Sequence, residues 1–324
     1  TLLSEGVNGV KIFTPEHGFR GTADEGALIN NSIDEKTQLP IISLYGNNKK
    51  PNESQLKDID ILIFDLQDVG TRFYTYISTM TYIMEAAAEN NIPLIVLDRP
   101  NPNGFYVDGP VLEPENKSFV GLHQVPIVYG LTIGEYALMV NGEYWLSDSL
   151  QCDLTVIPMG NYKRNAIYEL PVKPSPNLPN WESVYLYPSL CFFEGTIVSV
   201  GRGTEFPFQV YGHPKMNDEF VFTPRQAEGR RAPMLCDEEC HGEYLTDYAH
   251  NYRRNTNQIK LDWIINAYNQ LKGEKFFNNF FVKLSGTKEL QQQIEQGMTE
   301  SEIRATWQDD LDNYKKIREK YLMY

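Results

Sequence analysis

Short β-branched runs alternate with longer amphipathic stretches through the first half of the chain, and this alternation limits the possible folds most strongly. It extends from about Gly9 to Pro158. The runs that predict strands are Val10–Thr14, Ile41–Leu44, Ile59–Asp65, Leu94–Asp98 and Asp153–Pro158. Strands separated by helical stretches are typical of a parallel sheet covered by helices. We therefore predict an α/β fold for this half.

Two helices in this half have clear signals at their ends. Apolar residues recur at spacings of three or four from Phe73 to Ala87, which gives one apolar stripe. Asn90-Asn91, just before Pro93, ends this helix. A second helix is expected to begin near Thr132, because Thr132 and Glu135 have the spacing of a capping box.

The pattern changes in the second half. The segment Tyr162–Trp181 is rich in proline and asparagine and predicts a rigid connector. Beyond it, Val184–Glu194 and Thr196–Val200 are expected to be extended, whereas Leu261–Leu271 and Thr299–Tyr321 are expected to be helical, the latter with a capping box at its start. We therefore divide the chain into an α/β domain, residues 1–160, and a smaller α+β domain, residues 161–324.

Composition excludes several classes of protein. The chain has 324 residues, of which 41% are hydrophobic and 22% charged, so it is expected to be globular. No stretch approaches the roughly 18 apolar residues that a membrane span needs. The formal net charge of −14 repels nucleic acid, and no basic stripe reverses this locally. We therefore expect neither a membrane span nor a nucleic-acid partner, and the oligomeric state stays open.

The cysteines do not indicate a disulfide framework. Four are present, Cys152, Cys191, Cys236 and Cys240, which is too few for a scaffold in a chain of this length. Cys240 precedes His241, but the paired CxxC of a zinc site is missing, so packing or a single disulfide is favoured over a metal site. A chain that begins at Thr1 without a signal peptide is expected to be processed or trimmed.

Polar side chains cluster after three of the predicted strands. Ligands of a parallel sheet bind beyond the carboxyl ends of its strands, so these clusters are candidates for a site. Each cluster alone is equally consistent with helix caps and turns. The candidate side chains are Glu16, His17 and Arg20 after the first strand, Asp65, Gln67, Asp68 and Arg72 after the third, and Asp98, Arg99, Asn101 and Asn103 after the fourth.

These side chains suit acid–base chemistry. The sequence has no GxGxxG after the first strand, no GxxxxGK[ST] and no GxSxG. These absences argue against a dinucleotide-binding protein, a P-loop protein and a serine-nucleophile hydrolase. What remains is carboxylates, a histidine and several arginines. Paired carboxylates that flank a bond are the usual equipment of glycoside hydrolysis. We therefore expect a carboxylate enzyme without a metal or other cofactor.

The second half supplies a partner carboxylate. Glu194 lies between Phe193 and Gly195, a partly desolvated setting that suits a catalytic acid. Shortly after it, Gly201-Arg202-Gly203-Thr204 breaks an extended run with two glycines, which permit the backbone to approach a ligand closely. The alternatives are a buried structural acid at Glu194 and an ordinary salt bridge at Arg202.

At these residues the chain resembles a bacterial family of exo-β-N-acetylmuramidases, glycoside hydrolases of peptidoglycan recycling that were formerly a domain of unknown function. The motifs are long, ordered and spread over nearly the whole chain. They are PEHGFRG at 15–21, DLQDVGTRFYTY at 65–76, DRPNPNG at 98–104, SPNLP at 175–179, EGT at 194–196, GRGTEFPF at 201–208 and the closing YLMY.

The resemblance implies a Rossmann-like domain, with helices on both faces of its sheet, and a smaller C-terminal domain with the active site between them. It implies release of terminal N-acetylmuramic acid from peptidoglycan fragments, which are therefore the expected partner. Glu16 is the leading catalytic acid, and Glu194 is the second conspicuous carboxylate. Members of the family generally carry export signals, so the expected location is periplasmic or extracellular.

We hypothesise that Glu16, helped by His17, protonates the glycosidic oxygen, while Glu194 or Asp68 acts on the opposite face of the sugar. An anionic substrate needs local cations, and Arg20, Arg72, Arg99 and Arg202 are candidates to hold its lactyl carboxylate. The predicted substrate-binding residues are Arg20, Asp65, Gln67, Arg72, Tyr74, Tyr76, Asp98, Arg99, Asn101, Asn103, Arg202 and Thr204. The stereochemical course stays open between retention, inversion and participation of the substrate's acetamido group.

Two alternative functions remain. The run from Ile61 to Asp65, followed by Asp68 and Thr71, resembles the strand that ends in DxDGT in haloacid-dehalogenase-type phosphatases, but Gln67 stands where the second acid should be. Such a phosphatase would require magnesium. The other rival is a glycan-binding cell-surface protein that keeps the cleft without turnover. It would bind muropeptides but show no activity for Glu16→Gln to remove.

Overall fold

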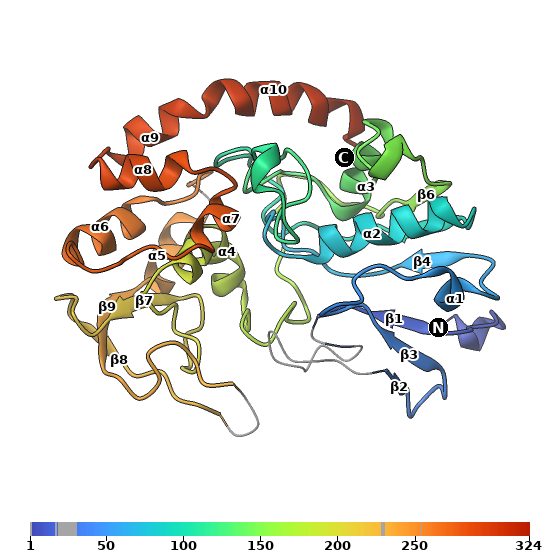
Figure 1. Cartoon of the computed structure of the whole chain (residues 1–324), viewed down its shortest axis with the longest axis horizontal. Coiled ribbons are helices and arrows are strands. Elements are labelled where there is room, and N and C mark those ends of the chain that lie inside the picture. Colours follow the sequence, from blue (N-terminus) through green and yellow to red (C-terminus); the bar gives the residue numbers. More distant parts are fainter. Residues whose placement is uncertain (1, 17, 19–30, 228–230, 254) are drawn as a thin grey trace.

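The computed structural model describes residues 2–16, 18, 31–227, 231–253 and 255–324. All five predicted strands of the first half are present in it (Figure 1). They are β1 (Ile12–Thr14), β3 (Pro40–Ser43), β4 (Leu62–Phe64), β5 (Leu94–Leu97) and β6 (Leu154–Ile157). The strand predictions are therefore confirmed, with ends shifted by up to three residues.

The strands pair in two small sheets. In one, β5 lies between β4 and β6, and both pairings are parallel. In the other, β1 is parallel to β3, and the short β2 (Ser32–Ile33) is antiparallel to β3. Because β1 and β3 run in the same direction, the loops that follow them leave the same edge.

Helices pack against the β4-β5-β6 sheet, as the α/β prediction requires. They are α1 (Glu53–Leu56), α2 (Tyr76–Glu89) and α3 (Ile133–Gly142). Met80 and Met84 of α2 share one buried core with Leu94 and Val96 of β5. The predicted capping box is confirmed, since Thr132 Oγ1 accepts from the Glu135 amide and Glu135 Oε2 accepts from the Thr132 amide. On the other side of the sheet, Ile63 is exposed.

One prediction for the second half is wrong. Val184–Glu194, expected to be extended, forms α4 (Trp181–Leu190), which begins at an Asn180 capping box and continues into a 3-10 helix, Cys191–Gly195. Every residue from 183 to 190 is buried. A helix buried on all sides has no polar face, so its sequence lacks the periodicity that separates a helix from a buried strand.

The remainder of the second half is a mixed α+β unit. Its antiparallel sheet has the order β7 (Val210–His213), β9 (Cys240–Tyr244), β8 (Phe220–Phe222). Thr196–Val200 forms only isolated bridges, Thr196 to Phe277 and Ser199 to Gly212. The helices are α5 (Thr246–Tyr252), α6 (Asp262–Gln270), α7 (Phe281–Ser285), α8 (Glu289–Glu295), α9 (Glu300–Thr306) and α10 (Gln308–Arg318), of which α6 and α9–α10 were predicted. No described helix is long and apolar enough to cross a bilayer.

The end of the chain returns to the first half. Figure 1 shows α10 passing over the molecule from the side of α9 to the side of α3, with the C-terminus beside α3. The Tyr314 hydroxyl donates to the Tyr129 carbonyl at 2.7 Å, and the Tyr324 hydroxyl donates to Asp98 Oδ2 at 2.8 Å. The last helix is thus part of the packing around the β4-β5-β6 sheet.

Arg72 joins the two halves from inside the protein. Its side chain is fully buried, and its guanidinium donates to four backbone carbonyls. Two of them belong to the first half and two to α7 and its end; they are Pro110, Val125, Leu284 and Ser285. Burial lowers the pKa of Arg72 to about 9. The prediction that Arg72 binds the substrate is corrected, because no part of it reaches solvent.

Asp68 is also part of the core. It is 2% exposed, and its Oδ2 accepts from the Tyr129 hydroxyl and from the Gly70 amide at 2.6 Å. Burial raises the pKa of Asp68 to about 6, and hydrogen bonds to the carboxylate oppose this shift. The prediction that Asp68 acts on the sugar is corrected for the same reason as Arg72.

We predict that Arg72→Met lowers the free energy of unfolding by at least about 3 kcal/mol, because four buried carbonyls lose their donors at once. Urea unfolding followed by fluorescence measures this change. The control is Arg99→Met, because Arg99 forms an exposed ion pair with Asp65 and its loss should cost less than about 1 kcal/mol. Equal effects of the two substitutions would contradict the role of Arg72.

A second prediction concerns pH. The unfolded Asp68 carboxyl titrates near 3.8 and the folded one near 6, so the folded state holds an extra proton between these values. Asp68 therefore lowers the free energy of unfolding as pH rises through this window, by about 3 kcal/mol. In Asp68→Asn this fall should be absent, which urea unfolding at pH 4 and pH 7 measures. The exposed control Asp65→Asn should keep the wild-type difference between the two pH values.

Candidate active site

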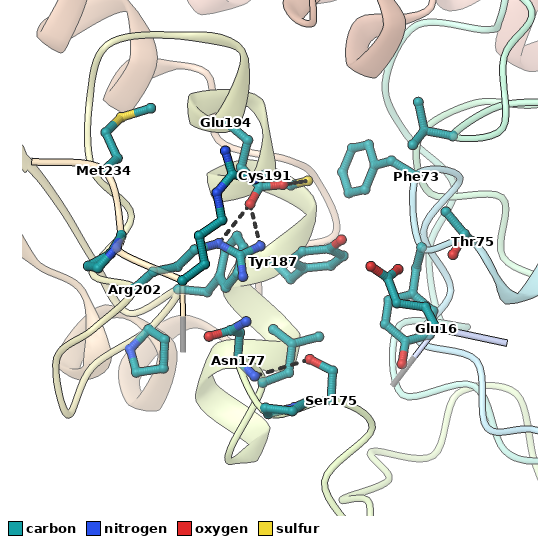
Figure 2. Close-up of a pocket in the computed structure, with 18 of the residues that line it drawn as sticks. Glu16, Phe73, Thr75, Ser175, Asn177, Tyr187, Cys191, Glu194, Arg202 and Met234 are labelled. Carbon is teal, nitrogen blue, oxygen red and sulfur yellow. Dashed lines mark hydrogen bonds and ion pairs between the residues drawn. The ribbon is translucent and has the colours of Figure 1, made fainter. Parts of the chain in front are cut away.

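Residues from both halves line one open pocket of about 1110 Å³. Figure 2 shows Glu16 on one wall and Glu194 on the opposite wall, with Tyr187 between them. The expectation that acids from the two halves meet around one cavity is therefore confirmed. Their catalytic roles stay predictions.

The first wall is built at the edge where β1 and β3 end. Glu16 follows β1, and Tyr45 follows β3, so parallel pairing of the two strands brings the side chains together. The Tyr45 hydroxyl donates to Glu16 Oε1 at 2.8 Å. The Tyr76 hydroxyl donates to the Glu16 carbonyl at 3.4 Å. These contacts fix both the carboxylate and the backbone of Glu16.

Tyr74 and Tyr76 line the same wall, as predicted. Their rings meet edge to face with centroids 4.9 Å apart, and the Tyr74 hydroxyl donates to the Pro174 carbonyl at 2.8 Å. Burial raises the pKa of Tyr76 to about 12, so at neutral pH it is a phenol that donates hydrogen bonds. Both tyrosines present their rings to the pocket while their hydroxyl groups hold the backbone.

The second wall is built around an ion pair. Arg202 Nε donates to Glu194 Oε1 at 2.9 Å, and Nη2 of the same guanidinium donates to the same oxygen. The Glu194 and Arg202 side chains are 18% and 23% exposed. The Arg202 guanidinium also lies over the Phe208 ring, 4.9 Å from its centroid. Glu194 and Arg202 thus form a salt bridge, as the structural alternative held, and this salt bridge faces the pocket.

Sequence reasoning missed two neighbours of Glu194. Cys191 Sγ lies 3.5 Å from Glu194 Oε2, and Tyr187 lies one turn earlier on α4. Burial raises the pKa of the Cys191 thiol well above its usual value, so it stays protonated at neutral pH. The spacing Tyr187, Cys191, Glu194 would have indicated a shared face if this segment had been recognised as helical.

Three cations on the pocket were missed as well. Lys49 follows Tyr45 in the loop after β3, and its ammonium lies over the Phe119 ring, 4.2 Å from the centroid. Arg225 and Arg231 also line the pocket. The sequence held a signal for Lys49, because it follows a predicted strand at the edge where the site was expected.

The other predicted polar residues assemble at a different place. Asp65 pairs with Arg99 at 2.6 Å, and Gln67 Nε2 donates to the Pro100 carbonyl at 2.7 Å. The clusters after β4 and β5 thus meet, as expected. They do not line the pocket, however, so the prediction that they bind the sugar there is corrected.

Three more of these residues hold loops together. Asp98 accepts from the Thr132 hydroxyl and from the Gly134 amide, which fixes the start of α3. Asn101 donates to the Leu131 carbonyl, and Asn103 donates to the Val69 and Val184 carbonyls. Asp98, Asn101 and Asn103 therefore cap a helix and hold turns, which was the alternative to ligand binding for these clusters.

The remaining predicted residues have mixed outcomes. Thr204 lines the pocket, and its hydroxyl donates to the Gly201 carbonyl at 2.7 Å. His17 and Arg20 lie outside the described residues. All four cysteines are free thiols. Within the described ranges, no group of three or more His, Cys, Asp or Glu side chains is arranged to hold a metal ion.

Comparison with known proteins covers the whole chain. The N-terminal model of exo-beta-N-acetylmuramidase NamZ matches residues 1–182, and the C-terminal model matches residues 185–324. The peptidoglycan beta-N-acetylmuramidase NamZ of Bacillus subtilis (strain 168) is 43% identical over 336 residues, which cover 97% of this chain and 79% of that protein.

Two crystal structures of DUF1343 family proteins from Bacteroides fragilis are also similar. One is 49% identical with a TM-score of 0.91, and the match covers 100% of this chain and 88% of that chain. The other is 31% identical with a TM-score of 0.81, and covers 98% of this chain and 87% of that chain. The fold class and the predicted resemblance are thereby confirmed, and the chain belongs to the exo-β-N-acetylmuramidase NamZ family.

Proposed function

We propose that this chain is a glycosidase that releases terminal N-acetylmuramic acid from peptidoglycan fragments. The observation that carries the proposal is the placement of Glu16 and Glu194 on opposite walls of one open pocket. Glycoside hydrolysis needs two carboxyl groups that flank the scissile bond. Membership of the family, and the activity named for the Bacillus subtilis relative, support the same reaction.

The contacts of the two carboxylates favour different roles. Glu194 Oε1 accepts two hydrogen bonds from Arg202, which holds this group as an acceptor. Such a group suits the orientation of a water molecule or of the substrate's acetamido N–H. Glu16, whose Oε1 accepts from the Tyr45 hydroxyl, lies across the pocket from this salt bridge, a position that suits the acid that protonates the leaving oxygen. We therefore assign the acid role to Glu16 and the orienting role to Glu194.

The phosphatase alternative fits the described structure poorly. Its nucleophile would be Asp65, which is paired with Arg99 away from the pocket. Gln67 stands where its second acid should be, and Asp68, the next acid along the chain, is buried against Tyr129. Neither carboxylate can meet a phosphoryl group in the pocket.

We also propose that the chain acts in the periplasm or outside the cell. Peptidoglycan, the substrate named for the relative, lies outside the cytoplasmic membrane, and the resemblance implies an exported protein.

We predict that Glu16→Gln and Glu194→Gln each lower kcat about 100- to 10,000-fold, the range expected when an acid or base that acts in the transition state is removed. The assay is release of N-acetylmuramic acid from a short peptidoglycan glycan, because its sugar leaving group needs a proton from the acid. The matched control is Glu205→Gln, because Glu205 is exposed next to Thr204 and is not part of the pocket lining. It should keep wild-type activity.

Several outcomes of this assay would count against the proposal. Full activity of Glu16→Gln would reject its role as the acid. Tight binding of muropeptides by the wild type without any turnover would instead identify a glycan-binding protein. A loss of activity in Glu205→Gln equal to that of Glu194→Gln would show that the substitutions act through general destabilisation.

The proposed location predicts recovery of the protein in the periplasmic or culture-medium fraction of the bacterium that produces it. Immunoblotting of separated fractions, with a cytoplasmic enzyme as the control for leakage, measures the distribution. Recovery together with the cytoplasmic control would overturn this part of the proposal and leave the proposed reaction untouched.

A further inference from the structure

The pocket is locally cationic in an acidic protein. The whole chain carries a formal net charge of −14. The charged residues among the described part of the lining are two carboxylates and four cations: Glu16, Glu194, Lys49, Arg202, Arg225 and Arg231. A surplus of positive charge confined to a pocket favours an anionic ligand there.

The four cations differ in how they are held. Arg202 is bonded to Glu194, and Arg225 pairs with Asp237 at 2.7 Å. Neither Lys49 nor Arg231 has a carboxylate partner within the described ranges. Arg231 is exposed, whereas Lys49 is half-buried. Among the cations of the lining, Lys49 therefore combines partial burial with the lack of a carboxylate partner.

An aromatic platform fixes the position of Lys49. Its ammonium lies 4.2 Å from the centroid of the Phe119 ring, and that ring stacks on Tyr82 with centroids 5.9 Å apart. A cation held on the face of a ring keeps N–H donors available for another acceptor. The next residue, Lys50, is different, because it pairs with Glu85 and Glu89 and does not line the pocket.

Lys49 also lies in the loop that carries a contact of the proposed acid. Tyr45, four residues earlier, donates to Glu16. In N-acetylmuramic acid the lactyl ether is attached to C3, separated from the anomeric carbon by one ring carbon. A sugar whose glycosidic oxygen meets Glu16 therefore brings its lactyl group to the same part of the pocket. That group ends in a carboxylate, the natural partner of an ammonium.

We propose that Lys49, on its Phe119 platform, binds the lactyl carboxylate and thereby selects N-acetylmuramic acid over N-acetylglucosamine, which lacks the lactyl group. The inference rests on the proposed function and adds to it the residue that determines specificity. Lys49 takes no part in proton transfer, so its loss should act on substrate binding and should leave the catalytic carboxylates in place.

The test compares two substrates with several variants. The substrates are a chromogenic muramide with a free lactyl carboxylate and the same compound with that carboxylate converted to an amide. For the wild type, we expect the amide to have a kcat/KM about 10- to 100-fold lower, mainly through KM, as for loss of a charge-assisted hydrogen bond. For Lys49→Met, which removes the charge and keeps an unbranched side chain only one atom shorter, the two substrates should differ less than about 3-fold.

Three controls accompany this comparison. Lys50→Met changes the net charge by the same amount and should keep the wild-type preference, because Lys50 is engaged with Glu85 and Glu89. Lys49→Arg should retain most of the preference. Arg231→Met tests the other cation without a described carboxylate partner. If Arg231→Met abolished the preference for the free carboxylate and Lys49→Met did not, the assignment to Lys49 would be overturned.

The result separates this inference from the proposed function. An equal loss on both substrates in Lys49→Met would overturn the inference while leaving the glycosidase proposal intact. If the wild type turned over neither substrate, the proposed function would fail, and calorimetric binding of N-acetylmuramic acid and N-acetylglucosamine would then test Lys49 alone. Equal affinities of the wild type for these two sugars would contradict the inference.

Discussion

A buried guanidinium joins segments from the two halves of the molecule. Arg72 donates to carbonyls of the loops around Pro110 and Val125, and also to those at the end of α7. Its surroundings are adapted to it: a Cβ at Gly286, where φ is +77°, would lie 2.5 Å from Arg72 Nη2. Separating these segments would leave four buried carbonyls and a buried charge without partners, at a large cost in free energy.

The rigid interior explains why the edge of the β4-β5-β6 sheet is not the site. Its polar side chains are engaged in structural hydrogen bonds: Asp98 accepts from the Thr132 hydroxyl and the Gly134 amide at the start of α3 and from the Tyr324 hydroxyl. The pocket instead uses the edge of β1 and β3 for Glu16 and the end of α4 for Glu194. The polar side chains at the edge of this sheet therefore stabilise the fold, whereas the pocket is lined from other elements.

The sequence predicted the strands and the pair of carboxylates because their signals are local. A β-branched run, or the capping box at Thr132, involves neighbours in the chain. Burial depends on residues that are far apart in the sequence, and it explains the predictions that were wrong. Arg72 and Asp68 are residue types that often bind ligands, but the fold buries both side chains. The α4 helix has no polar face because other elements surround it. Long-range packing, which a single sequence does not display, separates these residues from Glu16 and Glu194.

Charge organisation connects the fold to the chemistry. A protein with a formal charge of −14 repels an anionic glycan at long range, although salt screens this repulsion beyond about 10 Å. Attraction must therefore act at short range, from cations that are already positioned when the substrate arrives. Arg202 contributes while bonded to Glu194, so much of its charge is compensated. Lys49 is held by an aromatic face that compensates little of its charge, and this leaves the ammonium able to bind a carboxylate in the pocket that Glu16 also lines.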